Sequence, residues 1–290
     1  MYDICCIGHI TSDKIVTTTS VNYMPGGTAF YFSYALSKLN TRYLLVTSLA
    51  EAEMHYVDKL RNISVEVRVQ PGAHTVYFEN IYAENQDERT QNVLQTADTF
   101  TMQQLKDVST NIFHLGPLLA NDISLDLIKA LALKGTVSLD VQGYLRKVVN
   151  YKVQQTDWVQ KSAALPYISI LKADVAELSA LTGLKDVKDG ALKLADAGVK
   201  EVVITNGSRG SLIYKDGIFY KIPAYQPSII ADATGCGDTY MAGYLYQRSK
   251  DAGIQQAGEF AAAMAGLKTE KPGPFKGTEQ NVIQFLAKHS

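Results

Sequence analysis

Hydrophobic residues along the chain show two kinds of periodicity. In the first, short apolar runs alternate with segments in which apolar residues have helical spacing. The runs at 2–8 and 43–49 predict buried strands, and 28–39 has the spacing of a helix between them. This alternation is typical of a mostly parallel sheet covered by helices on both faces, so the predicted fold class is α/β. From about residue 100 it predicts strands at 111–115, 136–139, 167–171 and 201–205, and helices at 121–133, 174–182, 189–197, 237–249 and 256–267.

Residues 63–93 show the second kind of periodicity, in which every other residue is apolar. Valines from Val65 to Val69 alternate with polar residues, and the alternation resumes at Val76 and Phe78 after a predicted turn. A period of two predicts antiparallel strands with one exposed face, and the Val- and Thr-rich stretch 14–21 suits the same small sheet. We therefore predict a main α/β domain over 1–12, 23–72 and 95–290 and a β lid over 13–22 and 73–94.

Composition excludes several classes of protein. Of the 290 residues, 46% are hydrophobic and 20% are charged, which rules out a disordered or collagen-like chain. The formal net charge of -1 leaves no basic excess to neutralise phosphates, so we expect no nucleic-acid partner. No apolar stretch reaches the roughly 18 residues of a membrane span, so we expect no membrane partner.

The cysteines do not form a disulfide framework. Cys5 and Cys6 are neighbours in a predicted strand, so their side chains should point to opposite faces of the sheet. The beginning of the sequence has no pattern of a secretory leader. We therefore expect a protein of the reducing cytoplasm.

The segment 228–243 carries the strongest chemical signal. An apolar run at 228–230, predicted as a strand, leads into Gly235-Cys236-Gly237-Asp238 and then into a helix. The glycines let backbone N–H groups converge, and the helix N-terminus adds its dipole, which together form an anion site. Asp238 is then placed to accept a proton from a hydroxyl that attacks a phosphate. Taken alone, the same residues could equally form only a helix cap and a tight turn.

Several motifs along the chain resemble the ribokinase/PfkB family of carbohydrate kinases. Residues 232–239, Asp-Ala-Thr-Gly-Cys-Gly-Asp-Thr, are similar to the C-terminal signature of that family. Asp13 matches its sugar-binding aspartate, and the glycine pair at 26–27 resembles its di-glycine motif. The segments 172–177 and 205–210 resemble its Asn-x-x-Glu motif and its nucleotide-binding strand end. The motifs follow in the order of the family and cover nearly the whole chain.

The resemblance implies a three-layer α/β/α sandwich with a small β lid. It implies a kinase that uses ATP and Mg²⁺ and phosphorylates a hydroxyl of a small sugar or polyol. The roles that it implies are as follows: Asp238 as the base, with the backbone of Gly235, Cys236 and Gly237 as the anion hole; Asp13, Gly26 and Gly27 at the acceptor; Thr205, Gly207, Gly210, Thr234 and Gly273 at ATP; Glu177 and Asp174 at magnesium; and Asp232 at a possible K⁺.

Some of these residues allow a second interpretation. Asp174 and Glu177 also have the spacing of a capping box, which is a purely structural motif. Arg89 and Gln142 are added as acceptor contacts from their position alone, on a lid strand and at a strand end. Either could instead be a solvated charge or a strand terminator. Cys236 takes the position of a small packing residue rather than that of a nucleophile.

The acceptor remains open at this stage. The segments 79–82 and 89–91 are somewhat similar to a subgroup of the family that includes inositol kinases. A nucleoside kinase would need an aromatic clamp for the base, which Tyr23, Tyr31 or Phe78 could supply. A sugar-sensing binding protein without turnover is the alternative from another class. Exposed edges of the lid strands also predict a homodimer through the lid.

Overall fold

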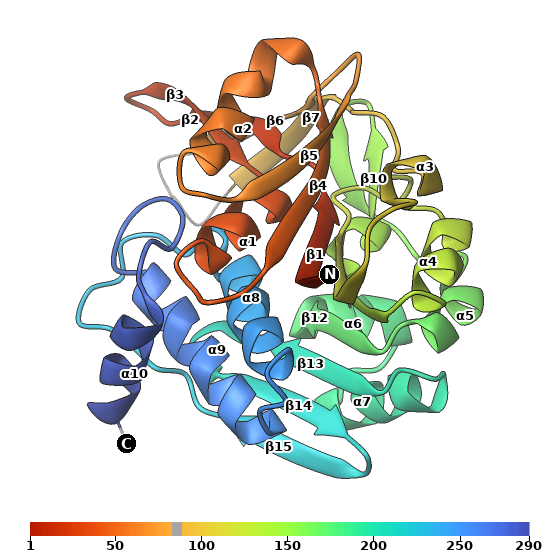
Figure 1. Cartoon of the computed structure of the whole chain (residues 1–290), viewed down its shortest axis with the longest axis vertical. Helices are drawn as coiled ribbons and strands as arrows, with labels where there is room; N and C mark the ends of the chain where they lie inside the picture. The colour runs from red at the N-terminus through yellow and green to blue at the C-terminus, as the bar shows by residue number, and fades with distance from the viewer. Residues whose placement is uncertain (83–88, 290) are drawn as a thin grey trace.

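The body of the protein is built on a largely parallel sheet (Figure 1). The computed structural model describes residues 1–82 and 89–289. The strand order is β15-β14-β13-β12-β9-β8-β1-β4-β5, and the described strand pairs are parallel except β13–β14 and β14–β15. The strands are β1 (Tyr2–Gly8), β4 (Tyr43–Leu49), β5 (Glu66–Pro71), β8 (Thr110–Gly116), β9 (Thr136–Asp140), β12 (Ile170–Asp174), β13 (Glu201–Thr205), β14 (Ser211–Lys215) and β15 (Ile218–Ile222).

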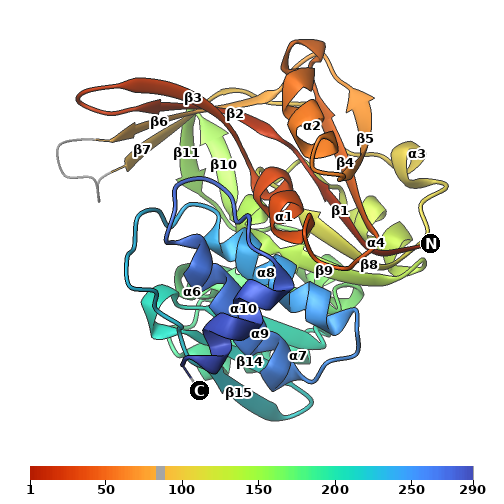
Figure 2. The same ribbon diagram turned by 60° about the vertical axis from the view of Figure 1, so that its left-hand side comes forward.

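Helices cover both faces of this sheet, which confirms the three-layer α/β/α prediction (Figure 2). Cys6 of β1 lies in the core beneath one helical layer, and Cys5 lies in the core beneath the other, as their adjacency in a strand predicts. The first layer contains α1 (Thr28–Leu36), α2 (Met54–Arg61), α8 (Cys236–Arg248), α9 (Ile254–Lys268) and α10 (Glu279–Ala287); the second contains α3 (Met102–Leu105), α4 (Leu125–Ala132), α5 (Lys161–Ala164), α6 (Val175–Thr182) and α7 (Val187–Asp196).

A second sheet stands over the carboxyl ends of the central strands (Figure 2). Its order is β10-β11-β7-β6-β2-β3. The strands are β2 (Thr11–Val16), β3 (Val21–Gly26), β6 (Val76–Tyr82), β7 (Arg89–Gln95), β10 (Arg146–Val149) and β11 (Lys152–Gln155). The sheet thus includes residues 11–12, 23–26, 146–149 and 152–155, which the sequence analysis assigned to the main domain. The division of the chain into body and lid stays a prediction.

The hairpin of β10 and β11 was missed by the periodicity because each strand has only four residues. Asn150 and Tyr151 turn it with positive φ values of 50° and 63°. Two consecutive positive φ values are typical of the tight turn that matches the twist of a hairpin. Asn150, a residue type that tolerates this conformation, was the signal that could have found it.

Two predictions about strands were wrong. The strand β5 is parallel to β4 in the main sheet, whereas its alternating valines predicted an antiparallel strand. It lies at the edge of that sheet, so its period of two reports one exposed face and not its direction. Residues 228–230 form no strand: Ile229 and Ile230 are 67% and 64% exposed in the loop before α8.

No helix in the described part of the chain is both long and apolar enough to span a membrane.

Candidate active site

A cleft of about 1080 Å³ lies between the lid sheet and the body. The carboxyl ends of β9 and β12 and the N-terminus of α8 open into it, as expected for a parallel sheet. The cleft brings together many of the residues predicted from the sequence. Its lining includes Asp13, Gly27, Gln142, Asp232, Thr234, Gly235, Cys236, Gly237, Asp238 and Gly273.

A second, smaller pocket adjoins the cleft. It measures about 330 Å³, and Thr205, Gly207 and Gly210 line it as predicted. Ala233, Cys236 and Gly237 line both cavities, so the loop before α8 and the first residues of this helix separate them. A molecule that occupied the pocket could therefore extend past this loop into the cleft.

The loop between the cavities depends on a glycine at its corner. Gly235 precedes α8 with a φ of 74°, a conformation that side chains with a Cβ rarely adopt. A Cβ at this position would lie 2.1 Å from Cδ1 of Tyr31, so the buried tyrosine ring packs directly against the loop. The N–H groups of the first turn of α8 then point toward the cleft, where an anion is favoured.

Cys236 behaves as a packing residue of this loop. Its Sγ donates to the carbonyl of Ala265 at 3.7 Å, and burial raises the pKa of the thiol to about 11. A thiol with this pKa is protonated at neutral pH and is a poor nucleophile. The interpretation of Cys236 as a small packing residue is therefore supported.

Asp238 lies in the first turn of α8, at the wall of the cleft. Burial and the nearby carboxylate of Asp140 raise its pKa to about 6, while Lys172 and a hydrogen bond from Thr28 act in the opposite direction. A carboxyl group with a pKa near 6 is ionised at neutral pH and still basic enough to accept a proton. A pKa near 6 is compatible with the predicted role of Asp238 as the base, which stays a prediction.

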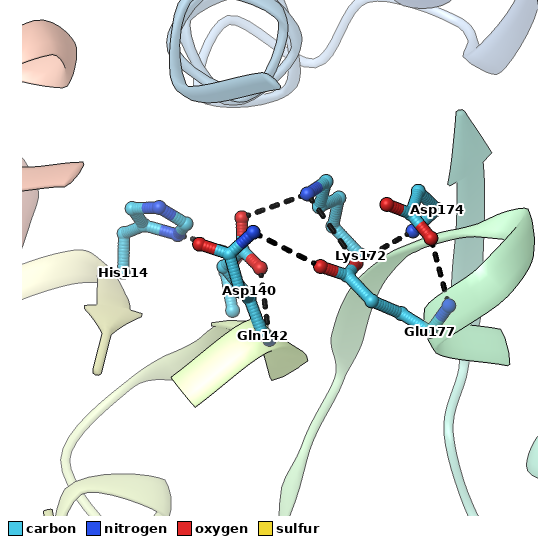
Figure 3. Close-up of polar contacts among 7 residues, drawn as sticks. His114, Asp140, Gln142, Lys172, Asp174 and Glu177 are labelled. Carbon is cyan, nitrogen blue, oxygen red and sulfur yellow. Dashed lines mark hydrogen bonds and ion pairs between the residues drawn. The ribbon is translucent and has the colours of Figure 1, made fainter. Parts of the chain in front are cut away.

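A buried lysine lies next to this base. Lys172 of β12 is 5% exposed, and its Nζ lies 3.0 Å from Asp140 Oδ2 and 3.7 Å from Glu177 Oε2 (Figure 3). The same Nζ lies 3.4 Å from the position that a Cβ on Gly237 would take, so the ammonium group faces the anion-binding loop. Interaction with these two carboxylates raises the pKa of Lys172 despite its burial, and the lysine stays charged.

The family model described as pfkB family carbohydrate kinase matches residues 1–281. The chain belongs to this family. It is accordingly a kinase whose acceptor group is a hydroxyl.

Individual relatives extend over most of the chain. A cytidine kinase of Thermococcus kodakarensis is 27% identical and aligns with 86% of this chain and 90% of its own length. A pyrophosphate-dependent kinase of the ribokinase family, solved with a pyrophosphate analogue and myo-inositol, is 28% identical with a TM-score of 0.87 over 97% of this chain and 99% of its own. Ribokinase of Arabidopsis thaliana with ribose and ATP has a TM-score of 0.83 over 98% of each chain at 21% identity, which shows the shared fold.

Glu177 and Asp174 of this pfkB kinase cap α6 in the way that the spacing allowed. The Glu177 N–H donates to Asp174 Oδ1 and the Asp174 N–H donates to Glu177 Oε2, each at 2.7 Å (Figure 3). Gln142 Nε2 donates to Glu177 Oε1 at 3.1 Å, so Gln142 holds Glu177 from the side of the cleft. The Asp174 side chain is committed to the helix cap.

Magnesium fits this part of the site only as an ion that arrives with the donor. Asp140 and Glu177 offer the carboxylate oxygens that Mg²⁺ prefers, but both also pair with Lys172. Within the described residues no group of three or more His, Cys, Asp or Glu side chains could hold a metal ion alone. Such a set fits an ion that is bound mainly by phosphates and keeps its waters.

Asp13 lies on the lid strand β2 and reaches the cleft from above. Its Oδ1 accepts a hydrogen bond from Thr11 at 2.6 Å. A Cβ on Gly26 would lie 2.3 Å from Asp13 Oδ2. Any larger residue at this position would therefore clash with the Asp13 carboxylate. Gly26 thus supports Asp13 from behind, and Gly27 lines the cleft itself.

Asp232 is positioned differently from a metal ligand. Its Oδ2 accepts from Lys268 at 2.8 Å and from the Gly273 N–H at 3.1 Å, and its Oδ1 accepts from the Thr234 N–H at 2.8 Å. Potassium therefore fits this place poorly, because an ammonium group already contacts the carboxylate. Arg89 is the first residue of β7, and its side chain lies outside the described part of the chain.

The sequence analysis missed the buried lysines of the site. Lys172 lies within the apolar run of β12, and Lys268 ends the largely apolar helix α9. A charged residue inside an apolar run must find a partner when the run is buried, and this was the available signal. Arg146 of the missed hairpin also lines the cleft.

The electrostatics of Asp238 predict the acid limb of the pH profile. The value of kcat/KM for the acceptor should fall as the pH drops below about 6, because the base is then protonated. Asp140→Asn removes a charge that raises the pKa of Asp238 and should move this limb to lower pH. Lys172→Met removes a charge that lowers that pKa and should move the limb to higher pH.

The measurement is a set of kcat/KM profiles against pH for the three proteins. Asp189→Asn, an exposed carboxylate in the first turn of α7, serves as the matched control and should leave the limb in place. Displacements in the same direction for Asp140→Asn and Lys172→Met would contradict the assignment of Asp238 as the base.

Proposed function

We propose that the chain is an ATP-dependent kinase of a small, unphosphorylated polyol or sugar, of the inositol type. The observation that carries this proposal is Asp238 beside the glycine loop, at the boundary between a polar cleft and an apolar pocket. An acceptor hydroxyl in the cleft and a donor from the pocket would meet at this point.

The reaction follows from that placement. Asp238 accepts the proton of the acceptor hydroxyl as its oxygen forms a bond to the γ-phosphorus of ATP. The bond from the γ-phosphorus to the β–γ bridging oxygen breaks, and ADP leaves. The N–H groups of the first turn of α8 and the Lys172 ammonium stabilise the charge on the transferring group. Mg²⁺, bound to the donor phosphates near Glu177, would supply further neutralisation.

Polar amides on the lid support a hydroxyl-rich acceptor. Asn80 of β6 is buried and Gln91 of β7 is half-buried, and both line the cleft. Gln91 Nε2 donates to Asn80 Oδ1 at 3.0 Å, which fixes the two amides relative to one another. Together with Asp13 they give this end of the cleft donors and acceptors that match a ring of hydroxyl groups.

A nucleoside acceptor is less well supported by the aromatic residues. Tyr23 is 63% exposed and does not line the cleft, and Tyr31 packs against Gly235. Phe78 lines the cleft but belongs to an apolar cluster beneath the lid with Val76 and Leu118. Tyr31 and Phe78 both line the cleft, but each ring is engaged in packing, which makes them poor candidates for a clamp around a base.

The smaller pocket supports ATP as the donor. Its walls are largely apolar and include Pro227, Ala262 and Ala265, which suit the flat face of an adenine ring. Gly207 and Gly210 leave its rim open at the end of β13. A pyrophosphate donor has no group that would fill this apolar space.

A sugar sensor without turnover is disfavoured by the state of Asp238. Burial and the nearby Asp140 carboxylate raise the pKa of Asp238. A protein that only binds sugar has no use for a carboxylate whose pKa suits proton transfer near neutral pH.

We expect ADP release from ATP and Mg²⁺ to depend on one class of acceptor in a panel of inositols, other polyols, sugars and nucleosides. Asp238→Asn should lower kcat by about 10²–10⁴ because it removes the base, whereas Asp189→Asn should not change kcat. Strong turnover with a nucleoside and none with polyols would refute the proposed acceptor. Sugar binding in calorimetry without turnover would favour the sensor.

The donor can be tested separately with a variant of the apolar pocket. Ala262→Phe should fill the space for the base and raise the KM for ATP about tenfold, equivalent to about 1.4 kcal/mol. Initial rates with ATP and with pyrophosphate are measured for both proteins. Turnover with pyrophosphate but not with ATP, unchanged by Ala262→Phe, would show that the donor is pyrophosphate.

We also propose a homodimer through the lid. The strand β3 is an edge of the lid sheet, and its residues Val21 and Tyr23 are 52% and 63% exposed. An uncovered edge with apolar side chains favours pairing with a second copy. Light scattering should give the mass of two chains, and Val21→Lys with Tyr23→Lys should give one. Leu133→Lys, which changes an 88% exposed residue after α4, should keep the dimer; a monomeric unaltered protein would exclude it.

A further inference from the structure

Asp232 joins three segments of the chain beside the anion-binding loop. Its carboxylate accepts the N–H groups of Thr234 and Gly273 at 2.8 and 3.1 Å. The N–H groups of Ala231 and Asp232 donate to the carbonyl of Thr269 at 2.7 and 3.2 Å. The loop that leads into α8, the end of α9 and the loop at 271–273 are therefore held together at this residue.

Lys268, the last residue of α9, places a positive charge at this junction. Its side chain is 0% exposed. The Nζ donates both to the backbone carbonyl and to the carboxylate Oδ2 of Asp232, each at 2.8 Å. A buried ammonium group is costly unless its charge is paired and its protons are hydrogen-bonded, so Asp232 determines where the lysine head group lies.

The charges of this pair act on the loop that would hold the transferring phosphoryl group. Burial is the largest cause of the raised pKa of the Cys236 thiol. Of the two charges, Lys268 lowers this pKa and Asp232 raises it. Without Lys268, the Asp232 carboxylate would add an uncompensated negative charge near a site for anions. A cation at this junction is thus needed both for the loop geometry and for the charge balance.

A free monovalent cation and a lysine ammonium can meet this need in the same way, since both are singly charged and both are held by oxygen atoms. In this chain the carboxylate and the carbonyl oxygen of Asp232 are already occupied by the side chain. We propose that Lys268 is a built-in monovalent cation that positions the loop before α8 and makes the enzyme independent of K⁺. The activity part of this inference rests on the proposed kinase function.

The unaltered protein should have the same kcat, KM and melting temperature in chloride salts of lithium, sodium, potassium and ammonium at one ionic strength. Lys268→Met removes the charge and leaves room at the oxygens of Asp232. In lithium chloride this variant should lose about 10- to 100-fold in kcat, because the loop is no longer held in place. Potassium or ammonium chloride should restore most of the loss and raise the melting temperature of the variant.

Two further variants separate a specific cation effect from general destabilisation. Lys271→Met removes an exposed lysine of the neighbouring loop and should behave like the unaltered protein in all four salts. The double variant Lys268→Met with Asp232→Asn lacks the carboxylate as well, so potassium and ammonium should not restore its activity. Lys268→Gln, which keeps a neutral donor for Asp232, replaces Lys268→Met if that variant does not fold in lithium.

Activation of the unaltered protein by potassium would overturn the proposal. So would a Lys268 variant whose lost activity and melting temperature respond equally to all four cations. The melting temperatures test the inference even if no acceptor is found, because they need no turnover. Absence of turnover in every protein would therefore count against the proposed function and leave the cation response to decide the role of Lys268.

Discussion

The ion pair between Lys172 and Asp140 is the interaction on which the charge balance of the cleft depends. A kinase site of this kind must keep a carboxylate base close to a donor that carries several negative charges. Lys172 supplies a buried charge at 3.0 Å from Asp140 and faces the loop at Gly237. Burial raises the pKa of Asp238, the Asp140 carboxylate raises it further, and the Lys172 ammonium group lowers it.

The same requirement appears on the other side of the loop, where Lys268 compensates Asp232. The N-terminus of α8 thus has one ion pair near Gly237 and a second one at Asp232, in the loop that precedes the helix. Gly235 allows the loop to turn within this narrow space, against the ring of Tyr31. Charge compensation by lysine side chains leaves few carboxylate oxygens for metal ions, so a magnesium ion at this site would have to be held mainly by the phosphates of the donor.

The lid supplies one wall of the cleft. Its strands come from three parts of the chain, and the hairpin of β10 and β11 brings Arg146 to the same cleft as Asp13 and Asn80. Periodicity indicated the lid strand near 76–82 because one face of it is exposed, whereas the Val- and Thr-rich stretch 14–21, predicted as one strand, contains the turn between β2 and β3. Periodicity could not separate the lid strand from β5, since an edge strand of a parallel sheet has the same period of two.

The sequence alone determined the α/β class, the order of most strands and helices and the glycine turn with Asp238, because periodicity and turn chemistry are local properties. The family motifs along it also indicated part of the cleft lining, from Asp13 and Gly27 on one side to the run from Gly235 to Asp238 on the other. Only the tertiary structure decided which charges meet. Asp140 finds Lys172 through the pairing of β9 with β12, and Asp232 finds Lys268 across the end of α9. Such contacts join residues that are distant in sequence, and no local pattern encodes their geometry.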